Sequence, residues 1–441
     1  MNQPLSPRLA RYLPLLESIE PMKAQGTVSD VIGLVIEGKG PAASIGEMCD
    51  IYPRSTSTPI KAEVVGFKGQ HILLMPLGDM HGVHPGSLII NRGERATVKV
   101  TPALQGRVLD GLGHPIDGQG PLRGVSEYPL YAQPLNPLRK NRITVPLDVG
   151  IRAINGLLTC GKGQRMGIFA GSGVGKSVLL GMIARHTQAD VNVIALIGER
   201  GREVREFIER DLGQEGLQKS VVVVATSDQS PLIRMRGAYV ATAIAEYFRD
   251  QGKDVLLLMD SLTRFAMAQR EVGLAIGEPP TTKGYTPSVF ALLPKLLERA
   301  GNAYDRGSIT GLYTVLIEND DLNDPIGDAV RAIVDGHIFL SRDLAAKNHY
   351  PAIQISHSLS RVMMDIVDPE HQKHAGELRE ILAIYQEAED LINIGAYVKG
   401  SNPRIDYALR MIEKVQAYLR QGIDEKVTFQ QSVEQLHALF A

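Results

Sequence analysis

The chain lacks tryptophan and contains only two cysteines, Cys49 and Cys160, among its 441 residues. Two cysteines cannot build a disulfide framework, so the composition is typical of a cytoplasmic protein. We expect both cysteines to be small buried hydrophobic residues rather than redox groups. No apolar run approaches ~18 residues, so no membrane-spanning helix is predicted. The N-terminus also lacks the apolar core and small-residue cleavage site of a signal peptide.

The sequence has no excess of either charge, since 47 Lys and Arg residues face 49 Asp and Glu residues, for a net charge of −2. This balance gives no electrostatic reason to expect nucleic-acid binding. Hydrophobic residues make up 44% and charged residues 22% of the chain, which excludes a wholly disordered protein and supplies apolar material for a core. At roughly 150 residues per domain, the length indicates about three domains.

Residues 1–24 form a distinct N-terminal segment. Several apolar residues near helical spacing could form one stripe: Leu9, Tyr12, Leu13, Leu16 and Ile19. Pro14 interrupts this stripe, which argues against a single regular helix. An ordinary packed segment and a segment that binds a partner or a membrane surface both remain open.

Residues 25–96 are predicted to form a small β-barrel, because short Val- and Ile-rich runs such as Val28–Ile36 alternate with glycine-containing turns. Such a barrel could bind single-stranded nucleic acid. However, the segment has six Lys and Arg residues against seven Asp and Glu residues, and its only aromatic residues are Tyr52 and Phe67. A basic groove and stacking platforms are both poorly supplied, which favours a structural or assembly barrel.

Residues 97–365 are predicted to form an α/β domain, because apolar strand-like runs alternate with longer helical stretches. Continuously apolar runs are typical of parallel strands buried on both faces. These runs are Arg165–Ala170, Val191–Ile197, Val221–Ala225, Val255–Met259 and Gly311–Ile317. Residues 366–441 contain no such run and are predicted to be helical, with helices over 372–395 and 404–440 separated by Gly395 and Lys399–Pro403.

The strongest motif is a phosphate-binding loop, AGSGVGKS, at Ala170–Ser177, between a predicted strand and the predicted helix Val178–His186. Glycines let the backbone N–H groups turn toward a phosphate, and the helix N-terminus adds positive charge. Lys176 is expected to reach the β- and γ-phosphates, and the Ser177 hydroxyl to ligate Mg²⁺. Alanine at the first position departs mildly from the strict pattern. The predicted nucleotide-binding residues of the loop are Gly171, Ser172, Gly173, Val174, Gly175, Lys176, Ser177 and Val178.

Two carboxylates follow other predicted strands. Asp260 ends an apolar run, where it is expected to hold Mg²⁺ through water. Glu199 lies just beyond Val191–Ile197 and can polarise an attacking water, while Arg200 can hold that carboxylate or contact phosphate. The alternative for Glu199 is the charged start of a solvated helix, whose residues include Glu203, Arg205, Glu206 and Glu209.

Together and in this order, the phosphate loop, Glu199 and Asp260 resemble the RecA-like headpiece of the rotary ATP synthase alpha/beta superfamily. The resemblance extends over about residues 25 to 420. Further matching segments are Arg107–Gly118, Pro146–Asn155, Gly161–Arg165, Tyr350–Ala352 and Ser358–Val362. This resemblance implies an α/β RecA-like core with an N-terminal small β-barrel and a C-terminal helical domain.

Within that superfamily, the chain is similar to the type III protein-export ATPases. The segments that carry this similarity are Ala225–Pro231, Asp260–Ala266 and Gly277–Ser288. The flagellar branch is indicated by Asp335–Arg342 and Ile392–Gly400. The nearest alternative is an injectisome ATPase, with the same chemistry and a different cargo. A hexameric RNA-dependent helicase and a non-catalytic ring subunit are more distant alternatives.

The resemblance implies roles for individual residues. Glu199 becomes the catalytic carboxylate, because the superfamily's non-catalytic subunits lack it. Arg361 becomes an arginine finger that stabilises charge on the γ-phosphate of the neighbouring subunit. Tyr350 stacks on adenine, and Arg264 contacts the phosphate side or braces Asp260. One chain that carries both Glu199 and Arg361 has a heterologous interface, which closes into a ring, and the family implies a homohexamer.

The implied function is Mg-ATP hydrolysis that energises export of flagellar subunits through a membrane-embedded channel. The implied partners are a stator-like regulatory protein at residues 1–24, a central coiled-coil stalk, an export gate at the membrane and export chaperone–substrate complexes. Glu387–Asp390 and the loop Glu278–Thr282 would face the stalk. No nucleic-acid partner is expected. The implied location is the cytoplasm, at the inner-membrane face of the flagellar export apparatus.

Overall fold

The computed structural model describes residues 24–54, 58–304, 306–317 and 324–441. The chain divides into two compact units. The first comprises the residues up to Ala96 together with Ala275–Gly277, and the second comprises Thr97–Leu274 and Glu278–Ala441. Apart from Ala24, the predicted partner-binding segment lies outside the described residues. Within the described residues, no helix combines the length and the hydrophobicity that are needed to cross a bilayer.

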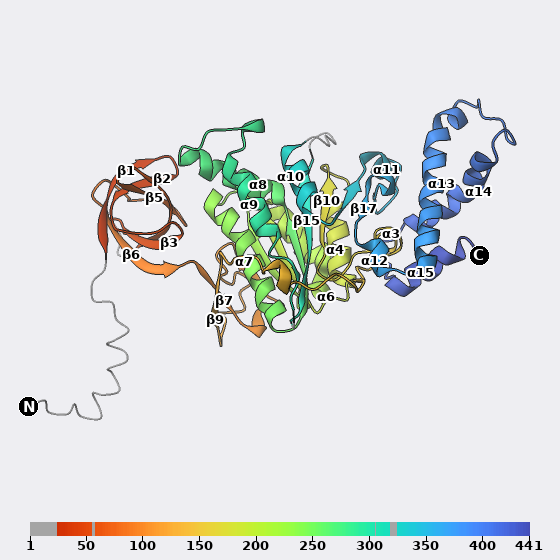
Figure 1. Cartoon of the computed structure of the whole chain (residues 1–441). Coiled ribbons are helices and arrows are strands. Elements are labelled where there is room, and N and C mark those ends of the chain that lie inside the picture. The colour runs from red at the N-terminus through yellow and green to blue at the C-terminus, as the bar shows by residue number, and fades with distance from the viewer. Residues whose placement is uncertain (1–23, 55–57, 305, 318–323) are drawn as a thin grey trace, which may run out of the picture. The chain divides into compact units, whose positions relative to one another are not determined.

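The first unit is a closed antiparallel barrel with the strand order β1-β2-β5-β4-β3-β6 (Figure 1). Its strands are β1 (Gln25–Ile32), β2 (Val35–Lys39), β3 (Glu47–Tyr52), β4 (Ile60–Lys68), β5 (His71–Pro76) and β6 (Leu88–Arg95). The predicted run Val28–Ile36 is two strands rather than one, because Gly33 turns the chain with a φ of 59°. Alternating side chains such as Ile36, Ile51 and Leu74 fill the barrel interior.

The second unit is built on a mostly parallel sheet with the order β17-β16-β10-β15-β13-β11-β12-β8. Its strands are β8 (Val108–Asp110), β10 (Arg165–Ala170), β11 (Val191–Ile197), β12 (Ser220–Ala225), β13 (Asp254–Asp260), β14 (Gly301–Asn302), β15 (Ser308–Leu316), β16 (Gly336–Leu340) and β17 (Leu359–Ser360). The short β14 and β17 pair antiparallel to β15 and β16. A separate ribbon joins β7 (Thr97–Val100) to β9 (Ser126–Pro129).

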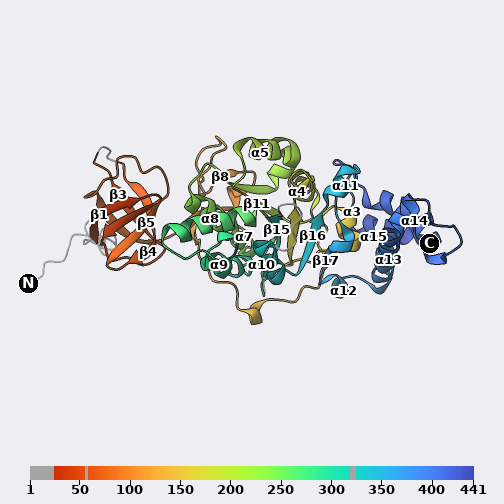
Figure 2. The ribbon, with the colours of Figure 1, turned by 90° about the horizontal axis from the view of Figure 1, so that it is seen from above.

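Helices cover both faces of this sheet (Figure 2). They are α3 (Arg152–Leu157), α4 (Lys176–His186), α5 (Gly201–Glu206), α6 (Gly213–Gln218), α7 (Pro231–Asp250), α8 (Leu262–Ala275), α9 (Pro287–Leu297), α10 (Pro325–Ile333), α11 (Arg342–Ala346) and α12 (Met363–Ile366). Shorter 3₁₀ turns are η1 (Pro102–Leu104), η2 (Pro137–Arg139), η4 (Thr282–Gly284) and η6 (Ile355–His357), and η3 (Phe207–Leu212) is a π-helix. Every residue of β11 is buried, as expected for a parallel strand that is covered on both faces.

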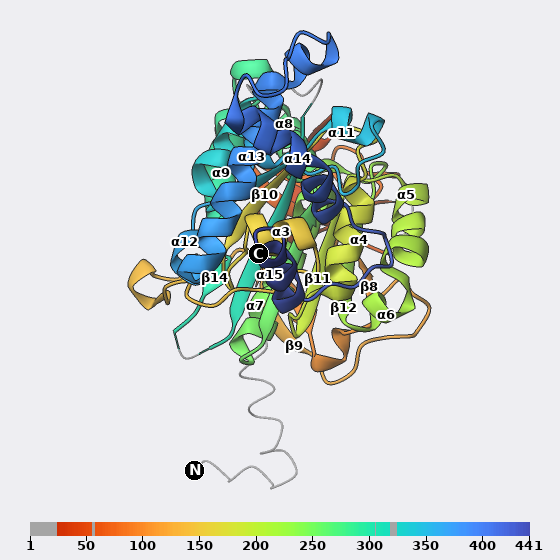
Figure 3. The same cartoon turned by 90° about the vertical axis from the view of Figure 1, so that its right-hand side faces the viewer.

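The C-terminal helices are α13 (Pro369–Asn393), α14 (Pro403–Leu419) and α15 (Phe429–Ala438). Figure 3 shows α15 beside α3 of the nucleotide-binding domain, and the two domains share one hydrophobic core. The prediction of a single helix over 404–440 was wrong, because the chain leaves the helix after Leu419. Thr428 starts α15 anew with a reciprocal capping box to Gln431.

The break between α14 and α15 docks on the nucleotide-binding domain through the buried side chain of Gln421. Its Nε2 donates to the carbonyl oxygens of Gly150 and Glu425, both at 2.8 Å. Its Oε1 accepts from the backbone N–H of Arg152, also at 2.8 Å. These bonds fix the segment because a buried backbone group without a partner is costly.

We expect Gln421→Leu to destabilise the chain by about 1–3 kcal/mol, because the leucine leaves buried backbone groups without partners. Thermal unfolding of the full chain measures this effect as a lower melting temperature. Gln430→Leu is the matched control, since Gln430 is exposed on α15 and binds only Glu434. Equal melting temperatures for the two variants would show that Gln421 does not hold the domains together.

Candidate active site

The phosphate loop joins the carboxyl end of β10 to the first turn of α4, as predicted. Gly173 and Gly175 have φ values of 80° and 86°, in the left-handed region that favours glycine. Gly175 is also the N-cap residue of α4, so the free N–H groups of the first helical turn open toward the loop. The loop therefore has the backbone geometry of an anion site at a helix N-terminus.

Lys176 lies between two carboxylates that come from neighbouring strands. Its ammonium group binds Asp260 Oδ1, and its Nζ lies 3.7 Å from Glu199 Oε1. Strands β13 and β11 pair in parallel, which brings Asp260 and the residues after β11 to the same edge of the sheet. The topology thus gathers the three charged groups that the sequence had placed on separate segments.

Asp260 is only 3% exposed, and the Thr314 hydroxyl on β15 donates to its Oδ1 at 2.6 Å. Sequence reasoning missed Thr314. The available signal was a polar residue within the apolar run Gly311–Ile317, but its partner could only be found from the pairing of β13 with β15. This hydrogen bond and the Lys176 ion pair fix the position of the Asp260 carboxylate.

The oxygen donors around the loop fit a magnesium ion. Ser177 lies in the first turn of α4, and Asp260 ends β13 beside Lys176. Hydroxyl and carboxylate oxygens are the hard ligands that Mg²⁺ prefers, and an Mg²⁺ ion in such a site also keeps several waters and takes phosphate oxygens. The predicted metal residues therefore have suitable chemistry and adjacent positions.

Burial raises the pKa of Glu199 from 4.5 to about 7; Lys176 opposes this rise and Asp260 adds to it. In its protonated form Glu199 donates a hydrogen bond to Glu203, and this bond lowers the pKa of the Glu203 carboxyl. Glu203 was expected only as part of a solvated helix face. The structure instead places its carboxyl group against Glu199, so the two carboxylates share a proton.

Three of the four arginines that line the phosphate cavity are placed in different ways. Arg200, expected to hold Glu199, has a side chain that is 79% exposed, and its Nη1 donates to Glu203 Oε1 at 3.2 Å. Arg264 packs against Gly198, where an added Cβ would lie 2.8 Å from the Arg264 Cβ. Sequence reasoning missed Arg342 as a site residue. Its guanidinium group packs against Gly171, where an added Cβ would lie 2.7 Å from its nitrogens. Gly171 thus leaves room for this cation beside the loop.

A cavity of about 850 Å³ opens over the phosphate loop. It is lined by the loop residues from Ala170 to Val178 except Val174, by Gly198, Glu199, Arg200 and Glu203, and by Arg210, Ser227, Thr263, Arg264, Met267, Leu316, Ile317 and Arg342. The volume falls in the range of small-molecule sites. The lining combines cationic groups, the loop backbone and carboxylates, which is suited to a metal-bound polyphosphate.

An adjoining cavity of about 610 Å³ has an apolar lining that suits a nucleobase. Tyr350, which is 40% exposed, lies beside the loop, where an added Cβ on Gly175 would be 3.3 Å from its ring. The opposite wall comes from the C-terminal domain, at Arg420–Glu425. Sequence reasoning missed this wall because it predicted a continuous helix there. The Tyr350 carbonyl accepts from the Gln421 N–H at 2.9 Å, which joins the two walls.

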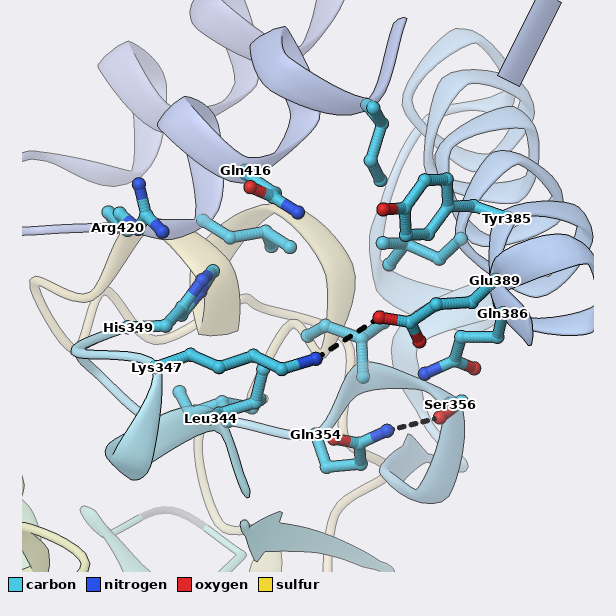
Figure 4. Close-up of a pocket in the computed structure, with 15 residues that line it drawn as sticks. Leu344, Lys347, His349, Gln354, Ser356, Tyr385, Gln386, Glu389, Gln416 and Arg420 are labelled. Atoms are coloured by element: carbon cyan, nitrogen blue, oxygen red, sulfur yellow. Dashed lines mark hydrogen bonds and ion pairs between the residues drawn. The ribbon is translucent and has the colours of Figure 1, made fainter. Parts of the chain in front are cut away.

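A smaller cavity of about 140 Å³ separates α13 and α14 from the segment that runs from α11 to η6 (Figure 4). Lys347 reaches across it, with its Nζ 3.2 Å from Glu389 Oε1. Burial, together with the charge of Arg420, lowers the pKa of His349 to about 4, so His349 is neutral at pH 7. Arg420 lines both this cavity and the apolar cavity beside Tyr350. The C-terminal helices therefore contact the segment that forms a wall of the nucleotide site.

Arg361 is exposed and does not line either nucleotide cavity of its own chain. It follows β17, and its N–H donates to the carbonyl of Asp335 at 3.0 Å, just before β16. Because β16 and β10 are parallel, this is the opposite edge of the sheet from the phosphate loop. The two edges are separated by the length of β10, whose five residue steps span about 17 Å. The predicted arginine finger therefore lies away from the phosphate loop of its own chain.

Family models match three parts of the chain. The beta-barrel domain of the ATP synthase alpha/beta family matches residues 28–93, and its nucleotide-binding domain matches residues 150–360. The C-terminal domain of the T3SS ATPase EscN matches residues 367–438. The flagellum-specific ATP synthase of Bacillus subtilis is 55% identical, over 96% of this chain and 97% of that protein. The chain belongs to the ATP synthase alpha/beta family.

This family member is a P-loop ATPase, and ATP is its nucleotide. The type 3 secretion system ATPase of Xanthomonas euvesicatoria is 53% identical, over 93% of each chain. The assembled ATPase EscN from the enteropathogenic E. coli type III secretion system superimposes with a TM-score of 0.89 at 47% identity, over 94% of this chain and 100% of that chain. EscN in complex with its central stalk EscO superimposes with a TM-score of 0.87 at 46% identity, again over 94% of this chain and 100% of that chain. The predicted fold class is confirmed.

We expect Glu199 to make stability depend on pH near neutrality. Its pKa is about 7 in the folded chain against 4.5 for the unconstrained group, so between these values the folded state retains a proton that the unfolded chain has lost. The contribution is fully present below about pH 4.5 and is lost as the pH rises through about 7. Glu199→Gln resembles the protonated form. The melting temperature of this variant minus that of the wild type should therefore rise across this window and level off above it.

Glu209→Gln is the control for this measurement, because Glu209 is 62% exposed and pairs with Arg205 at the surface. Its melting temperature should differ from that of the wild type by the same amount at every pH. Thermal unfolding without nucleotide gives both profiles. A flat profile for Glu199→Gln would show that the folded chain does not retain this proton.

We expect Tyr350→Ala to weaken ATP binding by about tenfold, because it removes ring contact with the base, whereas Tyr350→Phe keeps that contact. Equilibrium titration with a fluorescent ATP analogue measures the effect. Tyr304→Ala is the control, since Tyr304 is 64% exposed and lies outside both nucleotide cavities. Equal affinities for Tyr350→Ala and Tyr304→Ala would remove Tyr350 from the base pocket.

Proposed function

We propose that this ATPase hydrolyses Mg-ATP as a homohexameric ring and thereby energises type III export of flagellar proteins. The observation that carries the proposal is the placement of Lys176 between Asp260 and Glu199 at the floor of the phosphate cavity. A cation and two carboxylates at a phosphate loop supply the groups that phosphoryl transfer to water requires.

Each residue of the site has a distinct role in this proposal. The backbone N–H groups from Gly171 to Val178 hold the phosphates, and Lys176 leaves its carboxylate partners to bind the β- and γ-phosphate oxygens. Ser177 and Asp260 would hold Mg²⁺, which would supply positive charge against the negative charge that develops on the phosphate oxygens.

Glu199 orients the attacking water and accepts its proton. A general base works best when its pKa lies near the operating pH, and burial has raised the pKa of Glu199 to about 7. Glu203 shares the proton of Glu199, and Arg200 holds Glu203. Arg200 therefore acts on Glu199 through Glu203 rather than directly.

Arg361 completes the site of the neighbouring subunit. Its exposed position at the opposite edge of the sheet keeps it from its own phosphates, and a head-to-tail interface would bring it to those of the next chain. The assembled state of EscN supports a ring for this relative of EscN. The complex of EscN with its central stalk supports a coiled-coil stalk partner at the C-terminal helices, near Glu387–Asp390, and at the loop Glu278–Thr282.

The flagellar assignment rests on the relatives, several of which are named flagellum-specific ATP synthase, including the one from Bacillus subtilis. The Xanthomonas euvesicatoria secretion ATPase is nearly as similar, so an injectisome role is the alternative. In either case the protein would act in the cytoplasm against the inner membrane. Its further partners would be an export gate, chaperone–substrate complexes and a stator-like protein that binds residues 1–24.

We expect two inactive variants to restore activity when they are mixed. Glu199→Gln lacks the base but keeps Arg361, whereas Arg361→Ala lacks the finger but keeps Glu199. Random mixing at equal amounts gives about a quarter of the interfaces an intact base and an intact finger. The steady-state ATPase rate of the mixture, measured at a protein concentration that favours assembly, should recover to about that fraction of the wild-type rate.

Mixing Glu199→Gln with Lys176→Ala is the matched control, because every site in those rings lacks either the base or the phosphate-loop lysine. That mixture should stay inactive. Wild-type turnover per subunit should also climb with protein concentration. A flat concentration profile together with no recovery in the first mixture would contradict a shared site.

The export role is tested by the secreted proteins of a strain that carries Lys176→Ala. Loss of hook and filament proteins, with other secretion intact, is the expected result, because the variant cannot hold the phosphates. Lys373→Ala is the control, since Lys373 is 69% exposed and far in sequence from the loop. Loss of host-directed effectors with normal motility would move the protein to the injectisome branch.

A further inference from the structure

The C-terminal domain contains a cluster of metal-ligating side chains that the nucleotide site does not use. Glu370 and His374 lie one turn apart on α13, and His437 lies in the last turn of α15. One ligand atom from each of the three lies within 4.8 Å of the other two. Residues four apart share a helix face, so α13 presents both of its ligands to the same place. Figure 1 shows α15 beside the start of α13.

The two imidazole rings face each other through the same type of atom. His374 Nδ1 and His437 Nδ1 lie 2.6 Å apart. A neutral imidazole has one N–H donor and one bare nitrogen, so this contact requires one proton between two nitrogen lone pairs. A divalent cation can take the place of that proton and bind both lone pairs. The Phe440 ring stacks on the His374 ring, with 5.2 Å between the ring centroids and an interplanar angle of 27°. This contact fixes the orientation of the His374 imidazole.

A neighbouring histidine, His371, has a different role. It is buried, and its Nε2 contacts the carbonyl of Gly156 on α3 at 2.7 Å. Its ring centroid lies 6.4 Å from that of His437. His371 therefore docks α13 on the nucleotide-binding domain, while the other three residues connect α13 to α15.

We propose that Glu370, His374 and His437 bind a divalent transition-metal cation of the zinc type, which links α13 to α15. Two imidazole nitrogens and one carboxylate oxygen are a typical zinc donor set, with water as the fourth ligand. Tetrahedral Zn–N bonds of about 2.0 Å put two nitrogens about 3.3 Å apart, so the rings need only separate slightly. Mg²⁺ would not compete, because it prefers oxygen ligands.

The metal would stabilise the docking of the C-terminal domain. Helix α15 packs on α3, and Ser432 on α15 accepts a hydrogen bond from Asn155 on α3 at 3.4 Å. A ligand that binds only the folded state stabilises it by mass action. The cation would thus act at a distance from the nucleotide, on helix α15, which follows the segment Arg420–Glu425 that forms one wall of the pocket.

The test uses the full chain, freed of metal with a chelator and titrated with Zn²⁺ by calorimetry and with Co²⁺ by visible absorption. We expect one site per chain, with the intense Co²⁺ bands of tetrahedral coordination. His374→Ala and His437→Ala should each weaken binding by more than about a hundredfold, which exceeds the roughly 10–100-fold loss typical of an outer-shell residue. Zn²⁺ should raise the melting temperature of the wild type but not of these variants. His81→Ala is the control, since His81 is 94% exposed beside Asp79.

Binding that persists in both histidine variants would overturn the proposal, because the metal would then lie elsewhere, for example at Asp260. Absence of Zn²⁺ and Co²⁺ binding by the wild type would overturn it as well. Glu370→Gln covers the case in which the histidine variants do not fold, because Glu370 is exposed. Weaker Zn²⁺ binding by Glu370→Gln supports the site, and unchanged binding together with unchanged Co²⁺ bands contradicts it.

Discussion

The ion contacts of Lys176 with Asp260 and Glu199 are the interaction on which the site depends. An ammonium group between two largely buried carboxylates balances part of their charge before any nucleotide arrives. The phosphates of ATP must compete for that ammonium group, and a metal ion must then compensate the carboxylates. Nucleotide and metal therefore bind as one charge-balanced unit. Glu199 has a pKa near neutrality because burial disfavours its charged form by more than Lys176 favours it.

The parallel sheet makes this arrangement possible. Strands β10, β13 and β11 end at the same edge, so a loop lysine and two carboxylates that are distant in sequence meet there. The same topology sends Arg361 to the other edge, beside Asp335. A chain with an acceptor site at one place and a finger at another is incomplete alone, which is the physical reason for the proposed ring.

The sequence predicted those parts of the fold that depend on local pattern. Strands β10 and β11 begin and end at the predicted residues, because a buried parallel strand is a continuous apolar run. The phosphate loop could be predicted because its tight turn needs backbone angles that favour glycine, as at Gly173 and Gly175. Thr314, Glu203 and Arg342 could not, because their roles depend on partners brought close by the fold. Gln421 fell within the predicted helix over 404–440, although it is the buried contact that follows α14 and docks the pocket wall.

The most direct measurement is a structure of the assembled ring with Mg²⁺ and ADP–aluminium fluoride, a mimic of the transferring phosphate. The account predicts that Lys176 leaves Asp260 for the fluoride and β-phosphate, that Glu199 faces the attacking water, and that Arg361 of the neighbouring subunit contacts the fluoride. A ring in which Lys176 stays on Asp260, or in which no neighbouring Arg361 reaches the site, would contradict it.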